Sequence, residues 1–374
     1  MHCRQLSVIQ FKNLEELKVN LSPKFNCFAG QNGAGKTNLL DAIYYLSFCK
    51  SFTNPVDTQN IQFDKEFFVV QGLYQVNGQD DTLYCGFKRG QRKVFKRNKK
   101  EYERLSDHIG LYPLVLLSPA DTRLILGGSE ERRKFVDGVI AQYNREYLYK
   151  LITYNKALQQ RNALLKIFAE KRRFDRESLD IWDEQLVANG AYIYKERSAF
   201  FESFLPVFRR YYAFLSGQKE DTDILYDSTL HGADFQQLLQ ESVEKDRIAQ
   251  YSTVGIHKDD LSFLIHNEPV KRFGSQGQQK SFIIALKLAQ YAFTKNIKGY
   301  NPILLFDDIF DKLDAQRVSQ LMQLVSKEDF GQVFVTDTHP ERLEELFMSI
   351  DSECRIFVME KGRFANVKTL NEAS

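Results

Sequence analysis

An eight-residue stretch near the start of the chain has the composition of a phosphate-binding loop. It reads GQNGAGKT and matches the pattern GxxxxGK[ST], with a strand-like segment before it and an apolar helical pattern after it. Glycines let backbone N–H groups curl around phosphates, and the following helix adds the positive end of its dipole. We expect Lys36 to reach the β- and γ-phosphates of a nucleotide and Thr37 to bind Mg²⁺. The expected nucleotide-binding residues of this loop are Gly30, Gln31, Asn32, Gly33, Ala34, Gly35, Lys36 and Thr37.

A second stretch supplies the carboxylates that such a loop needs. ILLFDD at 303–308 is an apolar run typical of a buried strand, and it ends in two acids. We expect Asp307 to hold Mg²⁺ together with Thr37, and Asp308 to polarise an attacking water. An acidic pair at a strand end can also be a helix cap or a solvated turn. The phosphate loop favours the catalytic interpretation.

A third stretch, GQVFVTDTH, is another apolar run with a polar tip, and it ends at His339. A lone histidine is more often structural than catalytic. The position of His339, just past the strand that follows the acidic one, favours contact with the γ-phosphate or the attacking water. We therefore expect Lys36, Asp308 and His339 to be the catalytic residues.

One more loop is rich in glycine, serine and glutamine. It reads RFGSQGQQKS at 272–281, and an apolar helical pattern follows it at once. Its hydrogen-bonding side chains and glycines are suited to an anion, although the chain already has a phosphate loop far upstream. The residues alone do not explain why one chain has two such loops.

The elements that position these residues change in character along the chain. Strand patterns dominate up to about Ser118, helical patterns fill 130–215, and strands alternating with helices return after about 250. We expect a discontinuous α/β lobe I, formed by residues 1–118 and 251–374, and an inserted helical lobe II at 119–250. The longest helical run, about 30 residues, is too short for an extended coiled-coil arm, and Pro206 is expected to end or kink a helix.

Composition restricts the class of protein. The net charge is only +2, so an anionic partner must be met by local patches. No run approaches 18 apolar residues, and the N-terminus lacks the apolar core of a signal peptide, so we expect a cytoplasmic protein with no membrane partner. The five cysteines form no CxxC pair, which favours free buried thiols.

A strongly basic segment follows the first strands. It has no acid among its charges, and aromatic residues surround it. It could be a strip for nucleic-acid phosphates, or a solvated sheet edge protected by lysines. Because no base-reading motif is visible, DNA binding would depend on DNA structure and on salt, with little sequence preference. The candidate DNA-binding residues are Lys88, Arg89, Arg92, Lys93, Lys96, Arg97, Lys99 and Lys100.

These parts, in this order, resemble the ATP-binding-cassette (ABC) ATPases. The loop at 275–279 resembles their signature sequence, 310–314 resembles their D-loop, and His339 matches their switch histidine. The resemblance implies an α/β fold: an ABC-type P-loop ATPase head whose discontinuous lobe I contains mixed sheets, with an inserted helical lobe II and no long coiled coil. It also implies that two subunits meet head to tail around ATP and Mg²⁺, which explains a second loop. The residues it adds to the nucleotide site are Ser275, Gln276, Gly277 and Asp314.

The whole chain is similar to the RecF family of bacterial recombination mediators. The similarity rests on FKNL, GQNGAGKTNLLDAIYYLS, KSF at 50–52, and the segments 118–137, 255–261, 274–281 and 304–314. It implies an ATP-dependent homodimer that binds gapped or double-stranded DNA in repair and replication. It further implies RecR and RecO as partners and help in loading recombinase at single-strand gaps.

The similarity also implies a weak, DNA-stimulated ATPase. Asp308 stands where many ABC ATPases have glutamate, and its shorter side chain suggests slow turnover. Other classes remain open at this point: a transporter's nucleotide-binding subunit, an SMC-like chromosome protein, or a monomeric P-loop kinase or GTPase. The basic segment and the segments 118–137 and 255–261 argue against a transporter subunit. The missing arms argue against an SMC protein, and RFGSQGQQKS against a monomeric enzyme.

Overall fold

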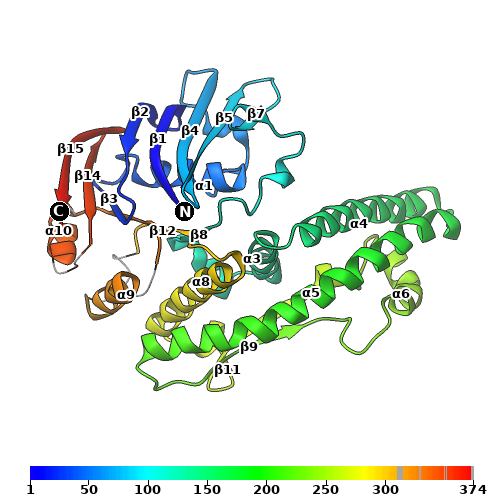
Figure 1. Ribbon diagram of the computed structural model, residues 1–374. Coiled ribbons are helices and arrows are strands. Elements are labelled where there is room, and N and C mark those ends of the chain that lie inside the picture. Colours follow the sequence, from blue (N-terminus) through cyan, green and yellow to red (C-terminus); the bar gives the residue numbers. More distant parts are fainter. Residues whose placement is uncertain (310–314, 328–329, 349, 351, 372–374) are drawn as a thin grey trace. The chain divides into compact units, whose positions relative to one another are not determined.

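The chain folds into two compact units (Figure 1). The computed structural model describes residues 1–309, 315–327, 330–348, 350 and 352–371. The sheet unit comprises Met1–Asp121 and Ile284–Ser374, and the helical unit comprises Thr122–Ile283. The division confirms the α/β fold with an inserted helical lobe, but the second boundary differs from the expected one after residue 250. Residues 251–283 belong with the helices because β10 (Asp260–Ile265) pairs with β9 (Thr222–Asp227).

An antiparallel sheet of six strands forms one layer of the sheet unit. Its order is β2-β1-β4-β5-β6-β7. Its strands alternate between buried and exposed residues, and the turn between β4 and β5 uses Asn77 and Gly78 at positive φ, as a two-residue hairpin requires. The bounds are β1 His2–Phe11, β2 Leu14–Asn20, β4 Phe67–Val76, β5 Gln79–Lys88, β6 Val94–Arg97 and β7 Lys100–Glu101.

A second, mixed sheet has the order β15-β14-β3-β13-β12-β8. Strands β14, β3, β13, β12 and β8 run parallel, and only β15 is antiparallel. The β3, β12 and β13 strands are buried at every residue, which explains why most of their residues are apolar. The bounds are β3 Phe25–Ala29, β8 Leu114–Leu117, β12 Ile303–Phe306, β13 Val333–Asp337, β14 Cys354–Glu360 and β15 Arg363–Leu370.

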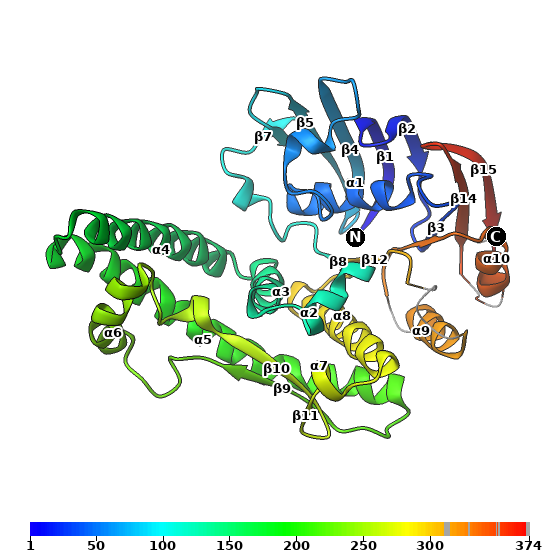
Figure 2. The same cartoon turned by 180° about the vertical axis from the view of Figure 1, so that it is seen from behind.

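Helix α1 packs between the two sheets of this unit. It contacts β1 and β4 on one side and β8 and β13 on the other, so its apolar side chains join one continuous core. Figure 2 shows the same elements from behind. The remaining helical segments of the unit lie outside that core layer. The bounds are α1 Lys36–Phe48, η1 Asp57–Asn60, η2 Leu105–Asp107, η3 Pro119–Thr122, α9 Ala315–Lys327 and α10 Pro340–Met348.

The helical unit is built on two long antiparallel helices, α4 (Arg145–Lys171) and α5 (Arg176–Ser216), which pack along each other. Asn144 caps α4 and Asp175 caps α5, each accepting a backbone N–H. A small antiparallel sheet of β9, β10 and β11 (Glu268–Pro269) completes the unit. The other elements are α2 Arg123–Leu126, α3 Ser129–Ala141, α6 Phe235–Ala249, η4 Ile256–Lys258, α7 Val270–Phe273 and α8 Gln276–Lys298, whose end extends into the sheet unit.

Helix α5 is longer than the sequence indicated. It has 41 residues, against an expected longest run of about 30. Pro206 lies inside it and does not end it. Phe204 and Phe208 on either side of the proline are fully buried, and this burial offsets the missing backbone hydrogen bond.

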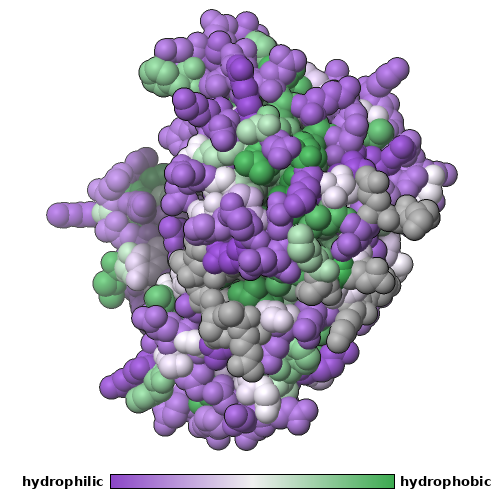
Figure 3. All heavy atoms as spheres, turned by 90° about the vertical axis from the view of Figure 1, so that its left-hand side faces the viewer, coloured by the Kyte–Doolittle hydropathy of each residue, from purple (hydrophilic) through white to green (hydrophobic). Residues whose placement is uncertain are grey.

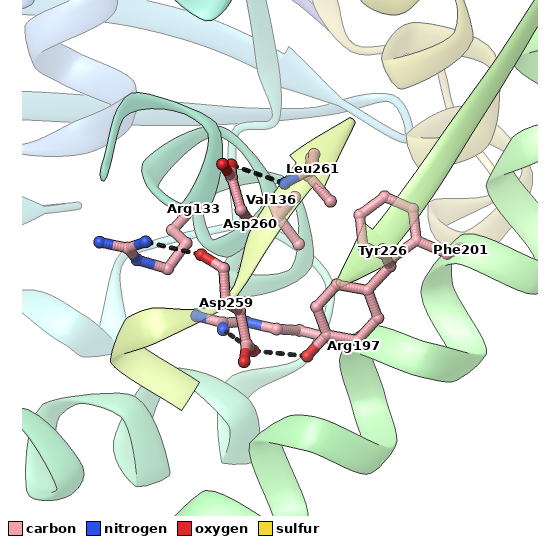
Figure 4. Close-up of a pocket in the computed structure, with 8 residues that line it drawn as sticks. All are labelled: Arg133, Val136, Arg197, Phe201, Tyr226, Asp259, Asp260 and Leu261. Atoms are coloured by element: carbon pink, nitrogen blue, oxygen red, sulfur yellow. Dashed lines mark hydrogen bonds and ion pairs between the residues drawn. The ribbon is translucent and has the colours of Figure 1, made fainter. Parts of the chain in front are cut away.

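A buried charge network holds the helical unit together (Figure 4). Arg197 is 2% exposed and donates to Asp137 at 2.8 Å and to Asp259 at 2.6 Å. The Tyr226 hydroxyl donates to Asp259 at 2.5 Å, and the Arg133 guanidinium donates to the Asp259 carbonyl at 2.6 Å. Burial raises the pKa of Asp259 above its usual range, and this effect outweighs the opposing influence of Arg197 and the hydrogen bonds. The network joins two segments on which the family similarity rests, 118–137 and 255–261.

No helix among these described ranges is both long and apolar enough to cross a membrane. Hydrophilic side chains cover most of the face drawn in Figure 3. All five cysteines are buried as free thiols.

Removing the centre of this network should destabilise the helical unit. We expect Arg197→Ala to lower its free energy of unfolding by about 3–5 kcal/mol, because the buried Asp259 and the partly buried Asp137 lose their cation. The measurement is urea denaturation followed by the fluorescence of Trp182, the chain's one tryptophan, which lies in α5.

The matched control is Arg209→Ala on the same helix. Its pair with Asp223 is 51% exposed on the arginine side, so the expected loss is about 0–1 kcal/mol. Equal losses for the two variants would contradict the importance of burial.

Candidate nucleotide-binding site

The loop between β3 and α1 has a backbone that only glycine adopts easily. Gly30, Gly33 and Gly35 have φ of 149°, 83° and 106°. A Cβ on Gly30 would lie 2.3 Å from the carbonyl oxygen of Met359, so this position is crowded as well as strained. The loop leads directly into the N-terminus of α1, which is the arrangement that binds phosphate.

Lys36 and Asn13 hold the loop from two sides. The Lys36 ammonium donates to the carbonyl oxygens of Gly30 at 2.6 Å and Gln31 at 3.2 Å, which places its charge within the loop. The Asn13 amide donates to the Gly33 carbonyl at 2.9 Å. Asn13 had no expected role, because its contact depends on the fold of β1 and β2.

Three polar side chains meet where the parallel strands end. Asp307, directly after β12, accepts from the hydroxyls of Thr37 and Thr336, each at 2.9 Å. Asp307 is buried, and burial raises its pKa above the usual range. The two hydroxyls oppose this shift but do not cancel it. Thr37 and Asp307 therefore come together as expected for a shared metal ion. Thr336 was not foreseen, since only the parallel pairing of β12 and β13 places it here.

Asp308 has a strained backbone. Its φ is 46°, which is uncommon for a residue other than glycine. Its N–H donates to the Thr336 hydroxyl at 2.9 Å, which fixes the conformation. A strained backbone of this kind persists only where the surrounding structure maintains it, and it is common at functional sites.

His339 lies on a turn held by an ion pair between the buried Asp337 and the partly exposed Arg342. Asp337, at the end of β13, accepts two bonds from Arg342 of α10, at 2.7 and 2.6 Å. The same carboxylate accepts the His339 N–H at 2.8 Å, and the Asp337 carbonyl accepts the Gly30 N–H at 3.1 Å. The His339 side chain itself is 67% exposed. The turn is therefore rigid, adjacent to the phosphate loop, and open to solvent at the imidazole.

The signature-like residues lie in the helical unit. Ser275 immediately precedes α8 and caps it: the Gln278 N–H donates to the Ser275 hydroxyl at 3.2 Å, and the Gln278 side chain accepts the Ser275 N–H at 2.7 Å. Ser275 and Gln276 are exposed and Gly277 is half-buried. A helix start presented to solvent in this way can contact a phosphate of another molecule. The remaining candidate, Asp314, lies outside the described residues, as does the D-loop-like segment 310–314.

Comparison with known proteins gives a family for this geometry. Residues 2–364 match the model of the RecF/RecN/SMC N terminal domain. The DNA replication and repair protein RecF of Phocaeicola vulgatus is 50% identical over 374 residues, covering all of both chains. The RecF protein of Flavobacterium johnsoniae is 50% identical over 357 residues, 96% of this chain and 99% of that one. The chain belongs to the RecF family of DNA replication and repair proteins.

Solved structures agree with the RecF assignment. The structure of the recombination mediator protein RecF with ATP is 29% identical with a TM-score of 0.87, covering 99% of this chain and 97% of that one. The Smc head domain from Pyrococcus furiosus, at 16% identity and a TM-score of 0.58, shares the fold alone. The chain is thus a member of the ABC-type ATPases, as the motifs indicated, and its RecF relatives bind ATP. The transporter and SMC alternatives are not supported.

Most of the basic segment in this RecF-family chain is exposed, but Lys93 and Lys96 are partly buried. Lys93 is only 13% exposed, and its ammonium donates to Asp57 at 2.8 Å and to the Tyr45 hydroxyl at 3.0 Å. The expectation that Lys93 faces DNA is therefore wrong, because a half-buried carboxylate pairs with its charge. Arg97 is also paired, with Asp81 at 2.9 Å, and the Lys96 ammonium lies over the ring of Tyr84. The exposed members are Lys88, Arg89, Arg92, Arg97, Lys99 and Lys100.

Basic residues of helix α3 are paired as well. Lys134 pairs with Glu130 at 2.8 Å, and Arg132 donates to both oxygens of Asp260 at 2.7 and 3.0 Å. Pairing within the helical unit therefore accounts for these two charges.

A methyl group on Gly30 should disrupt the loop. We expect Gly30→Ala to weaken Mg-ATP binding roughly tenfold or more, because the Met359 carbonyl and the positive φ both oppose it. Calorimetric titration with Mg-ATP measures the effect. The control is Gly78→Ala, where φ is also positive, at 81°, but no atom lies within 4 Å of the added Cβ. Equal ATP affinities for the two variants would show that crowding at Gly30 has no effect on binding.

Proposed function

We propose that the chain is an ATP-switched, DNA-binding recombination mediator. The observation that carries the proposal is the placement of the nucleotide groups. Lys36, Thr37, Asp307 and Asp308 converge at one edge of the sheet unit, whereas Ser275 caps the exposed start of α8 in the helical unit. The family supports the same interpretation, since a RecF relative is described as a recombination mediator with ATP.

Magnesium ion would be held by Thr37 and Asp307. Their oxygens are already 2.9 Å apart, and a hydroxyl with a carboxylate is a donor set that Mg²⁺ prefers. Mg²⁺ would neutralise phosphate charge there. Asp308 orients the attacking water, and His339, on its braced turn, contacts the γ-phosphate. Because aspartate reaches less far than glutamate, we propose slow hydrolysis that DNA accelerates.

The second half of the site comes from another copy of the chain. Ser275, with its neighbours Gln276 and Gly277, contacts the γ-phosphate held by the partner's phosphate loop. Binding of ATP thereby stabilises the dimer, and hydrolysis releases it. The nucleotide-binding role of Asp314, which is outside the described residues, is proposed from the resemblance of 310–314 to the D-loop.

The closed dimer binds double-stranded or gapped DNA through the exposed part of the basic segment. The aromatic and basic residues around β5 and β6 suit a phosphate backbone without base reading. RecR and RecO would be its protein partners, and the cytoplasm its location, where it helps to load recombinase at single-strand gaps. The RecFOR pathway named for its structural relatives supports these partners.

The dimer is tested by light scattering with and without ATP. We expect Ser275→Ala to bind Mg-ATP normally but to dimerise about tenfold more weakly or worse, because the hydroxyl that donates to the phosphate is removed. Lys36→Ala should lose both ATP binding and the dimer.

Asn144→Ala controls for the lost helix cap. Asn144 caps α4 in the same unit by accepting the Tyr147 N–H at 2.9 Å, so its variant should dimerise like the wild type. A Ser275→Ala chain that dimerises normally, or a wild type that stays monomeric with ATP, would contradict the proposal.

DNA contact is tested by charge removal. We expect replacement of Arg92, Lys99 and Lys100 by glutamine to weaken duplex binding. The salt dependence of the binding constant should also become shallower, by about 0.9 for each phosphate that these side chains no longer neutralise. Fluorescence anisotropy at several salt concentrations measures both quantities.

The control removes the same charge from the hairpin of β14 and β15. Lys361, Arg363 and Lys368 are exposed in the same unit, and their replacement by glutamine should leave the salt slope unchanged. Equal losses for both variants would show a general charge effect and contradict a specific strip.

A further inference from the structure

The cap of α8 is tied to the end of α5 by one carboxylate. The Gln278 side chain accepts the Ser275 N–H at 2.7 Å and donates its amide to Glu220 at 2.8 Å. Glu220, in the loop between α5 and β9, also accepts the hydroxyl of the buried Tyr212 at 2.5 Å. All four residues belong to the helical unit.

The Tyr212 end of this chain of bonds is firmly packed. The Tyr212 ring contacts the Phe282 ring edge-on, with centroids 5.8 Å apart, and Phe208 contacts Phe282 at 4.7 Å. Phe282 lies in the second turn of α8 and is fully buried. On the other side of Ser275, the Gln279 amide donates to the Gly274 carbonyl at 3.0 Å. Glu220 therefore connects an exposed cap to a rigid aromatic cluster.

The chemistry of Glu220 determines which way the Gln278 amide faces. An ionised carboxylate only accepts hydrogen bonds, so the NH₂ group of Gln278 must point toward it. The amide oxygen of Gln278 then faces the Ser275 N–H, which is the orientation that the cap needs. The Ser275 hydroxyl accepts from the Gln278 N–H, so its proton stays available for a phosphate oxygen.

We propose that Glu220 is a positioning residue for the trans contact of Ser275. It acts through Gln278, fixes the cap before the partner arrives, and so lowers the ordering cost of ATP-dependent dimerisation. The proposal rests on the proposed function, because it assumes that Ser275 contacts nucleotide on a second copy. It assigns no contact with ATP to Glu220 itself.

The test compares the dimer dissociation constant with the ATP affinity of the isolated chain. We expect Glu220→Ala to weaken the ATP-dependent dimer about tenfold, since a hydrogen bond to a charged group is lost, with unchanged ATP affinity. Glu220→Gln should restore most of the dimer, because its amide oxygen can accept from Gln278. Gln278→Ala should weaken the dimer as Glu220→Ala does, and the double variant should add little further loss.

A matched pair on α6 provides the control. Gln237 donates to Glu241 at 2.7 Å with the same chemistry in the same unit, so Glu241→Ala should dimerise normally. If Ser275→Ala weakens the dimer while Glu220→Ala does not, the inference is wrong and the proposed function stands. If Ser275→Ala itself dimerises normally, the proposed function fails first. Additive losses in the double variant of Glu220 and Gln278 would also overturn the inference, because they would show that Glu220 does not act through Gln278.

Discussion

The parallel pairing of β3, β13 and β12 is the constraint on which the site depends. Ala29 pairs with Asp337 and Phe306 with Val335, so the three strands end at one edge of the sheet. The phosphate loop, the acidic pair and the histidine turn follow those ends, although about 270 residues separate the first two. The Thr336 hydroxyl then joins β13 to both aspartates. A shift of register in any of these strands would separate the groups.

Local chemistry explains which parts of the site the sequence could predict. GQNGAGKT and ILLFDD could be recognised from sequence because the function of each depends on neighbouring residues. Glycines and a lysine define the phosphate loop, and acids after an apolar strand define the metal site. Thr336, Asn13 and Glu220 were missed because each acts through a partner distant in the chain. Lys93 was misassigned for the same reason: its charge pattern is that of the exposed strip, but the fold places Asp57 beside it.

The family-specific segments prove to be largely structural. Arg132 pairs directly with Asp260, and Arg197 joins Asp137 to Asp259. Segments 118–137 and 255–261 therefore stabilise the helical unit. The buried Asp41 of α1 likewise joins two other family segments. Lys12 of FKNL pairs with Asp41, and Ser51 of KSF donates to it at 2.5 Å. A buried charge is costly to leave unpaired, so the identities of both residues in each pair are constrained. The inserted helical lobe was predictable, but its second boundary was not, since it depends on the pairing of β9 with β10.

The central claim is that one nucleotide is held by two chains, and mixing two inactive variants tests it most directly. Lys36→Ala lacks a working phosphate loop but keeps its Ser275, and Ser275→Ala has the reverse defect. In a head-to-tail dimer of the two, one site receives both intact parts. We therefore expect each variant alone to fail to hydrolyse ATP in the presence of DNA and the mixture to recover turnover. A mixture as inactive as its components would contradict a site shared by two chains.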